Sequence, residues 1–187
     1  MNETELYRQF KNLGRDLFLS GALAARSGNM SQKRSDGALT ITRSGAMLSD
    51  LSESDLITVS LQNDAPAINA SSEVEIHRAI INNKSGKEAV VHAHCPYTIA
   101  LANVYGEVFA DNECLSCFGP PLLLGDQDKF IVGGYKDQIA GALSNHVVAV
   151  VAGHGVFAAA QTLLEAYIYL TALEASSKLV YLQKTLQ

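Results

Sequence analysis

The chain has 187 residues, of which 48% are hydrophobic and 18% are charged. This composition supplies a hydrophobic core, excludes intrinsic disorder and contains no linker-like segment, so we expect a single domain over residues 1–187. The net charge is −5 and the basic residues are scattered, which argues against nucleic acid or an anionic membrane as a partner. The chain starts with a polar, amphipathic segment and contains no long apolar run, so we expect a cytoplasmic protein.

The three cysteines are too few for a disulfide framework and fit a reducing compartment. Cys114 and Cys117 form a CxxC pair, but no second pair of ligands at zinc-site spacing accompanies them. A redox CxxC normally opens a helix after a strand, whereas Phe-Gly-Pro-Pro follows Cys117 here. We therefore expect buried or partly buried free thiols.

The chain begins with an amphipathic helix, predicted over residues 3–20. Apolar residues recur there at helical spacing: Leu6, Phe10, Leu13 and Leu17. Asn2 and Glu5 can form a capping box at its start. Two short strands are predicted next, Ala38–Thr42 and Leu56–Ser60, separated by Gly, Ser and Asp residues. This order indicates a meander rather than a βαβ repeat.

The middle of the chain predicts a helix followed by the central strands. Ser72 can cap a helix that has Glu75 three residues on and runs to about Asn82. The segments Ala89–His94 and Val147–Ala152 are rich in Val, which favours buried central strands. We expect these two strands to be neighbours.

Further helices are predicted between and after the central strands. A short helix over 97–104 is followed by a loop through Gly119-Pro120-Pro121, and a second helix covers about 135–144. The longest helix runs from Gln161 to about Gln183. Strands and helices that mix without strict alternation predict a three-layer α/β or α+β sandwich.

Three histidines form a candidate metal site. His92 and His94 alternate in a predicted strand, so their side chains project from the same face. His154 follows the second central strand, where Gly153 and Gly155 allow a sharp turn. Three neutral imidazoles leave a divalent ion its full charge and one open position, which favours zinc at an enzyme active site.

A histidine beside an apolar strand is more often a hydrogen-bonded core residue than a ligand. Two adjacent buried imidazoles without a partner, however, incur a desolvation cost and mutual repulsion, and a metal ion removes both. His146 and His77 have no such neighbours, and we expect both to be structural.

Three further segments complete an ordered pattern with these histidines: residues 27–31 (Ser-Gly-Asn-Met-Ser), 42–45 (Thr-Arg-Ser-Gly) and 71–73 (Ser-Ser-Glu). In this order and spacing the sequence strongly resembles the class II aldolase/adducin family, whose members include L-fuculose-1-phosphate aldolase. The similarity runs from the first helix to about Ala175. No single motif is specific, but the ordered set is.

The resemblance implies a three-layer α/β/α fold around a mainly antiparallel sheet, and a homotetramer with sites between neighbouring subunits. It implies one zinc ion per chain on His92, His94 and His154, with manganese or cobalt as alternatives. It also implies a phosphorylated sugar as substrate, whose phosphate is surrounded by Gly28, Asn29, Ser44, Gly45, Ser71 and Ser72.

The chemistry of these phosphate-site residues agrees with the resemblance. Glycine backbones approach an anion closely, hydroxyl and amide groups donate to it, and a helix start at Ser72 presents free N–H groups. The same segments can also be ordinary Gly/Ser turns. Arg43 adds a cation beside Ser44, and we expect it to contact a phosphate or a carboxylate.

Glu73 is the candidate general acid/base. The epimerase branch of the family usually carries Asp at the matching position, whereas aldolases and methylthioribulose-phosphate dehydratases carry Glu. A carboxylate there can also simply stabilise the helix dipole. Each lysine is placed by the sequence in a polar loop or on a solvent face, so a Schiff-base lysine with a depressed pKa is not expected.

The resemblance therefore implies a metal-dependent aldolase that reversibly cleaves a phosphorylated ketose, such as L-fuculose 1-phosphate, to dihydroxyacetone phosphate and a small aldehyde through a metal-stabilised enediolate. Residues 111–118 contain no tyrosine, where family aldolases carry a proton donor for the aldehyde. Two alternatives stay open: a sugar-phosphate dehydratase or 4-epimerase, and a non-enzymatic adducin-like interaction module.

Overall fold

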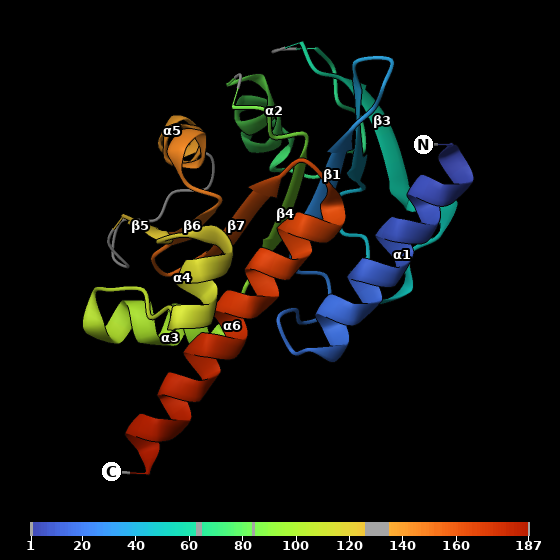
Figure 1. The fold of residues 1–187 in the computed structure, drawn as a ribbon. Coiled ribbons are helices and arrows are strands. Elements are labelled where there is room, and N and C mark those ends of the chain that lie inside the picture. Colours follow the sequence, from blue (N-terminus) through green and yellow to red (C-terminus); the bar gives the residue numbers. More distant parts are fainter. Residues whose placement is uncertain (1, 63–64, 84, 126–134, 187) are drawn as a thin grey trace.

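The computed structural model describes residues 2–62, 65–83, 85–125 and 135–186. A seven-stranded sheet lies between two layers of helices, with α1, α3, α4 and α6 on one face and α2 and α5 on the other (Figure 1). Two hydrophobic clusters fill the spaces between the sheet and the layers. The predicted three-layer α/β/α architecture is confirmed.

The strand order is β3-β2-β1-β4-β7-β6-β5, and every pair is antiparallel except β5 with β6. The strands are β1 (Asn29–Lys33), β2 (Ala38–Thr42), β3 (Leu56–Ser60), β4 (Ala89–Ala93), β5 (Leu122–Leu124), β6 (Val148–Val151) and β7 (Gly155–Ala160). The first three strands form a meander, of which the sequence predicted β2 and β3 but not β1. The sheet is mainly antiparallel, as the resemblance implied.

The prediction that the two Val-rich strands, β4 and β6, are neighbours is wrong, because β7 separates them. It lies between β4 and β6 and pairs with both, His92 being opposite Phe157 in the register with β4. Its sequence ends in three alanines, and alanine is depleted in strands, so propensity did not reveal it. All six residues of β7 are buried at the centre of the sheet.

Helix α1 (Glu3–Leu19) forms as predicted, and its apolar stripe is buried. The Asn2 side chain accepts a hydrogen bond from the backbone N–H of Glu5 at 2.8 Å, which satisfies one free donor at the helix start. Two 3-10 turns, η1 (Leu48–Asp50) and η2 (Glu53–Asp55), connect β2 to β3.

Helices α2 (Val74–Asn82) and α5 (Lys136–Asn145) pack on each other across the second face of the sheet. The predicted cap at Ser72 is wrong. The helix starts at Val74 with Glu73 as N-cap residue, and it is Ser71 whose hydroxyl oxygen accepts the Glu73 N–H, at 3.3 Å. The backbone thus enters α2 later than expected, which leaves the carboxylate of Glu73 at the helix start.

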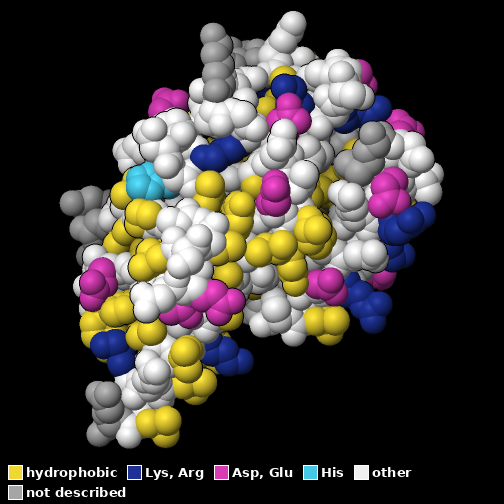
Figure 2. Space-filling view, in the orientation of Figure 1, with side chains coloured by type: hydrophobic (Ala, Val, Ile, Leu, Met, Phe, Trp, Pro, Cys, Tyr) yellow, Lys and Arg dark blue, Asp and Glu magenta, His cyan; other side chains and the backbone are white. Residues whose placement is uncertain are grey.

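Helix α6 (Leu163–Thr185) crosses the first face of the sheet and starts with a capping box between Thr162 and Glu165. Its Glu174 carboxylate accepts the N–H groups of Tyr97 and Thr98 at the start of α3 (Pro96–Tyr105). Hydrophobic side chains lie exposed along the path of α6 toward the C-terminal end (Figure 2). They include Leu164, Ile168, Leu179, Tyr181 and Leu182.

Helix α4 (Asn112–Phe118) carries the CxxC pair. Cys95, Cys114 and Cys117 are all free, as expected, but Cys117 is exposed rather than buried. Burial raises the pKa of the Cys114 thiol to about 11, and the neighbouring Asp111 carboxylate adds to this. Among the described residues, no helix is long and apolar enough to cross a membrane.

Candidate functional site

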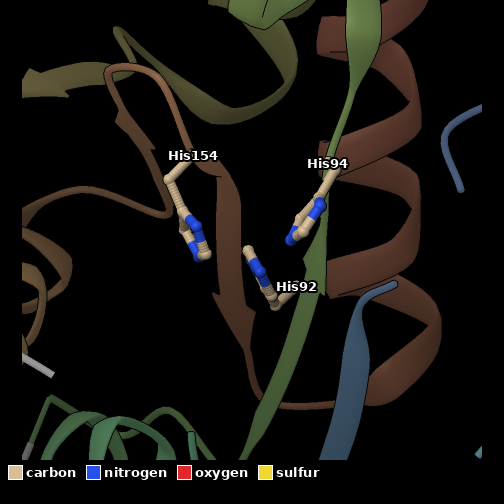
Figure 3. Close-up of side chains that lie close together, drawn as sticks. All are labelled: His92, His94 and His154. Carbon is tan, nitrogen blue, oxygen red and sulfur yellow. The ribbon is translucent and has the colours of Figure 1, made fainter. Parts of the chain in front are cut away.

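The three predicted histidines meet at the carboxyl end of β4 (Figure 3). His92 lies in β4, His94 directly follows it, and His154 lies in the turn between β6 and β7. The ring centroid of His92 is 5.1 Å from that of His94 and 4.9 Å from that of His154. One ligand atom from each residue lies within 4.8 Å of the others, so the donor set can hold one divalent ion.

His92 is fully buried, and its hydrogen bond fixes its tautomer. Its Nδ1 lies 2.9 Å from the carbonyl oxygen of Val156, which can only accept, so Nδ1 carries the proton. The Nε2 lone pair then has no hydrogen-bond donor among the described residues. Burial lowers the pKa of His92 to about 3, which keeps the ring neutral. A buried, unprotonated nitrogen held from behind fits a metal ligand.

The glycines beside His154 are required by this geometry. A Cβ at Gly155 would lie 2.7 Å from the carbonyl oxygen of Ala93 and 2.7 Å from the His92 ring. Gly153 has φ +71°, which side chains disfavour. These two positions let the turn bring the ring of His154 against the other two, as the sequence predicted.

Glu73 joins the histidine cluster from the start of α2. Its Oε1 is 3.0 Å from Nε2 of His154, and its Oε2 accepts a hydrogen bond from the Asn29 amide nitrogen at 2.6 Å. Burial by itself raises the pKa of this carboxyl group. The hydrogen bond with His154, the nearby His92 ring and the Asn29 amide outweigh burial and hold the pKa far below its usual range.

The contact between Glu73 and His154 has a chemical consequence. Carboxylate oxygens accept hydrogen bonds, so Nε2 of His154 is the donor in this arrangement. The same nitrogen cannot donate to Glu73 and ligate a cation at once. A cation bound through this nitrogen would take the place of the N–H group, so that Oε1 of Glu73 would lose this hydrogen bond while Oε2 keeps its contact with Asn29.

A buried network behind Glu73 includes a histidine whose role the sequence analysis missed. Nε2 of His77 is 2.5 Å from Oδ1 of Asn29, and Nδ1 is 2.6 Å from the hydroxyl of Ser31. Burial lowers the pKa of His77 to about 4. Position 77 is four residues after Glu73, on the same face of α2. This spacing was the signal in the sequence that His77 lies near Glu73.

The predicted substrate residues gather around one pocket with a volume of about 210 Å³. Glu73, His94 and His154 line it, and so do all seven residues expected from the sequence: Gly28, Asn29, Arg43, Ser44, Gly45, Ser71 and Ser72. His92 lies behind them, fully buried. The structure thus brings the two predicted halves of the site together in one cavity.

The turns around the pocket have the backbone conformations that small residues allow. Gly28 and Gly45 have φ of +78° and +70°. A Cβ at Gly28 would meet the His92 carbonyl oxygen at 2.6 Å, so the turn packs directly on β4. Ser44 and Ser72 are exposed at the pocket, where their backbone and hydroxyl groups can reach an anion.

Arg43 lines the pocket, but its guanidinium is engaged by Asp55, with Nη2 2.6 Å and Nε 3.0 Å from the same carboxylate oxygen. Its contact with a substrate stays a prediction. Arg26 also lines the pocket and was not singled out from the sequence. Its guanidinium lies 3.8 Å from where a Cβ of Gly45 would be, and among the described residues no acidic side chain pairs with it.

Lys87 lies in a loop, as the sequence predicted, but the expectation that no lysine has a depressed pKa is wrong for it. Lys87 is half-buried, and its ammonium group donates to the carbonyl oxygens of Leu143 and His146 at the end of α5. Burial lowers its pKa to about 8. Lys87 does not line the pocket that holds Glu73, however, so it offers no Schiff-base nucleophile there.

Comparison with known proteins identifies the family. The family described as "Class II Aldolase and Adducin N-terminal domain" matches residues 8–181. L-fuculose phosphate aldolase of Methanocaldococcus jannaschii is 27% identical, over 94% of this chain and 95% of its own. A 3-oxo-tetronate 4-phosphate decarboxylase of Pectobacterium atrosepticum is 25% identical, over 97% of this chain and 86% of its own.

Among solved structures, L-fuculose-1-phosphate aldolase from Thermus thermophilus superimposes with a TM-score of 0.86 at 31% identity. The superposition covers 98% of this chain and 96% of that one. The family match spans most of the sequence, and the fold agrees from the first helix to the last. The chain belongs to the class II aldolase/adducin family.

Proposed function

We propose that this protein is a metal-dependent lyase that reversibly cleaves a phosphorylated ketose, similar to L-fuculose 1-phosphate, to dihydroxyacetone phosphate and a small aldehyde. The observation that carries the proposal is the single pocket in which a buried carboxylate, Glu73, lies between three histidines and a wall of Gly and Ser turns. Relatives whose names state fuculose-phosphate aldolase activity support the substrate class.

The histidine cluster supports the metal requirement. We propose one divalent ion per chain on His92, His94 and His154, zinc by the preference of imidazole ligands, with manganese or cobalt as alternatives. When bound, the ion supplies a Lewis acid that stabilises negative charge developing on substrate oxygens. The buried Nε2 of His92, which lacks a hydrogen-bond partner among the described residues, is the observation that favours a bound cation.

Glu73 is proposed as the general acid/base. Its carboxylate is ionised, and its burial, with 7% of the residue exposed, excludes most water from it. In the synthetic direction it takes the proton from the carbon beside the dihydroxyacetone phosphate carbonyl, and the electron pair of that bond forms the enediolate. In the cleavage direction it returns the proton to the same carbon.

The turns on the opposite wall are proposed to hold the phosphate. Gly28, Gly45 and Ser72 offer backbone N–H groups, and the start of α2 adds the positive end of its dipole. Arg26 supplies a cation at the same wall. Phosphate binding there fixes the distance between the substrate carbonyl and Glu73.

Decarboxylation of a 3-oxo acid phosphate is the second candidate. Loss of carbon dioxide from a 3-oxo acid also leaves an enolate that needs stabilisation and protonation. Two observations favour it: a relative is named 3-oxo-tetronate 4-phosphate decarboxylase, and Arg26 lines the pocket without an acidic partner among the described residues, so that a second anionic group can bind beside the phosphate. The dehydratase and 4-epimerase alternatives share the same chemistry.

We further propose that residues 1–187 form one domain and that four copies assemble. Exposed apolar side chains along α6, such as Leu164 and Leu179, support association. A light-scattering mass near 20.0 kDa at micromolar concentration would contradict it.

An adducin-like interaction module needs no ordered acid/base, whereas Glu73 here is held by Asn29 and His154.

The decisive experiment uses metal-loaded protein and dihydroxyacetone phosphate in deuterium oxide. The proposal predicts loss of one carbon-bound proton signal in the NMR spectrum, and Glu73→Gln protein is the control. Phosphorylated ketoses are then screened for dihydroxyacetone phosphate release, and 3-oxo acid phosphates for carbon dioxide. A diketone product would place the protein among the dehydratases, and absence of exchange by metal-loaded wild type would reject the aldolase assignment.

A further inference from the structure

Four buried polar residues form a continuous line that ends at Glu73. Ser31 and Asn29 come from β1, and His77 and Glu73 from the first turns of α2. The contacts are 2.6 Å from Ser31 to His77, 2.5 Å from His77 to Asn29, and 2.6 Å from Asn29 to Glu73. Ser31 and His77 are fully buried and do not line the pocket. They therefore cannot act on a substrate directly.

The polarity of this line follows from chemistry. A carboxylate only accepts hydrogen bonds, so the amide nitrogen of Asn29 faces Glu73 and its carbonyl oxygen faces His77. That oxygen needs a donor, so His77 carries its proton on Nε2. Nδ1 of His77 is then an acceptor and takes the hydroxyl proton of Ser31. Every donor in the line points toward Glu73.

The opposite polarity is disfavoured. If His77 carried its proton on Nδ1, Nε2 would need a donor, and Asn29 would have to turn its amide nitrogen toward the ring. The Asn29 carbonyl oxygen would then face the Glu73 carboxylate, placing two acceptors together in a buried site. A buried clash of this kind costs more than a lost hydrogen bond.

We propose that His77 is a positioning residue for Glu73: as the neutral Nε2–H tautomer it orients the Asn29 amide, which holds one carboxylate oxygen of Glu73 and leaves the other directed to His154 and the pocket. This inference rests on the proposed acid/base function of Glu73. The same line connects to the histidine cluster, because Asn29 and His92 are partners in the β1–β4 register.

Two substitutions of His77 separate orientation from packing. Glutamine places an amide near the position of Nε2 and keeps a donor for Asn29, whereas asparagine reaches only to Nδ1 and keeps the Ser31 contact alone. His146 offers a matched control, since it bonds a carbonyl of Pro120 far from this line. The measurements are deuterium exchange into dihydroxyacetone phosphate, its KM, bound metal and thermal midpoint.

His77→Asn should lower kcat for exchange by about 10- to 100-fold with KM and metal content little changed, because a displaced base loses its alignment. His77→Gln should recover most of that loss, and His146→Asn should match wild type. Equal kcat losses in the Gln and Asn variants, tracking their thermal midpoints, would overturn the proposal and leave His77 as a packing residue.

A second measurement needs no variant and no activity. The ¹⁵N shifts of the His77 ring in wild-type protein report its tautomer, and the proposal requires protonated Nε2 and unprotonated Nδ1. A ring protonated on Nδ1, or on both nitrogens at neutral pH, would overturn it. If wild type catalyses no exchange while the tautomer is as stated, the function of Glu73 fails and the orientation of its side chain stands.

Discussion

The two walls of the pocket are built in different ways. On the inner wall Glu73 is buried and accepts a hydrogen bond from Asn29 of β1. Behind it, His92 is fully buried and donates to the carbonyl oxygen of Val156 in β7. On the outer wall Ser44, Gly45 and Ser72 are exposed in turns. The inner wall fixes the reacting groups before a substrate arrives, whereas the outer wall offers backbone groups that gain their partners from the substrate.

The largest expected effect comes from removing one imidazole of the histidine cluster beside Glu73. His94→Ala should abolish tight binding of the divalent ion and all exchange activity, because two imidazoles do not complete a site for zinc. Metal content by elemental analysis, after purification without chelators, measures the first effect. His146→Ala is the matched control and should keep about one ion per chain. Wild type that is as metal-free as the variant would contradict the proposed site.

Glu73→Gln should separate proton transfer from metal binding. Glutamine keeps the size of the side chain and can still bond Asn29, but it cannot accept a proton. The exchange rate should fall by at least about 10²-fold. The variant should retain the ion, as measured by elemental analysis. A rate within a few-fold of wild type would show that another group moves the proton.

The buried histidines predict a pH dependence for the metal-free protein. The folded-state pKa of His77 is about 4, below its ordinary value of 6.5. As the pH falls through 6.5, the unfolded chain therefore binds a proton at His77. The folded chain does not bind this proton until the pH is much lower. The free energy of unfolding is therefore highest above pH 6.5. It declines toward pH 4 by on the order of 1 to 3 kcal/mol per buried histidine.

Urea unfolding of chelator-treated protein at several pH values measures this decline. His77→Gln should flatten part of it, because glutamine does not titrate. A free energy of unfolding that stays level down to about pH 4 would show that His77 is not buried in its neutral form.

Substitutions in the outer wall should have smaller effects than those at His94 and Glu73. Ser72→Ala removes an exposed hydroxyl that lines the pocket, and it should weaken binding of a phosphorylated ligand by about 1 to 3 kcal/mol. Competition by inorganic phosphate measures the affinity. Ser116→Ala, at an exposed position of α4, is the control. Unchanged affinity in the Ser72 variant would mean that this turn is only structural.

The sequence predicted the inner wall better than the network behind it. His92 and His94 share a face because strands alternate, and the glycines around His154 indicate a turn, so local rules were sufficient. The contact between His77 and Asn29 joins residues 48 positions apart, and it depends on how β1 meets α2. No local pattern contains that pairing.

Two other misses have local causes. Strand β1 was not predicted because its residues are largely polar, yet Asn29 and Ser31 are buried in it by hydrogen bonds to α2. The helix cap was assigned to Ser72, whereas the N-cap residue is Glu73, whose N–H donates to the Ser71 hydroxyl. Two adjacent serines offer equal capping signals, and neither indicates that the helix begins after both of them.

The smallest expected effect concerns the cations of the outer wall. Arg26 is exposed and free of an acidic partner among the described residues, whereas Arg43 is bound to Asp55. Arg26→Ala should therefore raise KM for a phosphorylated ketose only about 2- to 5-fold, as expected for an exposed ion pair, and added salt should reduce the difference. Arg15→Ala, at an exposed position of α1, is the control.

The same variant distinguishes the two candidate functions. If the substrate carries a carboxylate besides its phosphate, Arg26 has a second negative group to bind, and its loss should affect 3-oxo acid phosphates more than ketose phosphates. Equal effects on both substrates would leave Arg26 as a phosphate contact and favour the aldolase. No effect on either would exclude Arg26 from the anion site, so the backbone N–H groups of the turns would bind the phosphate without it.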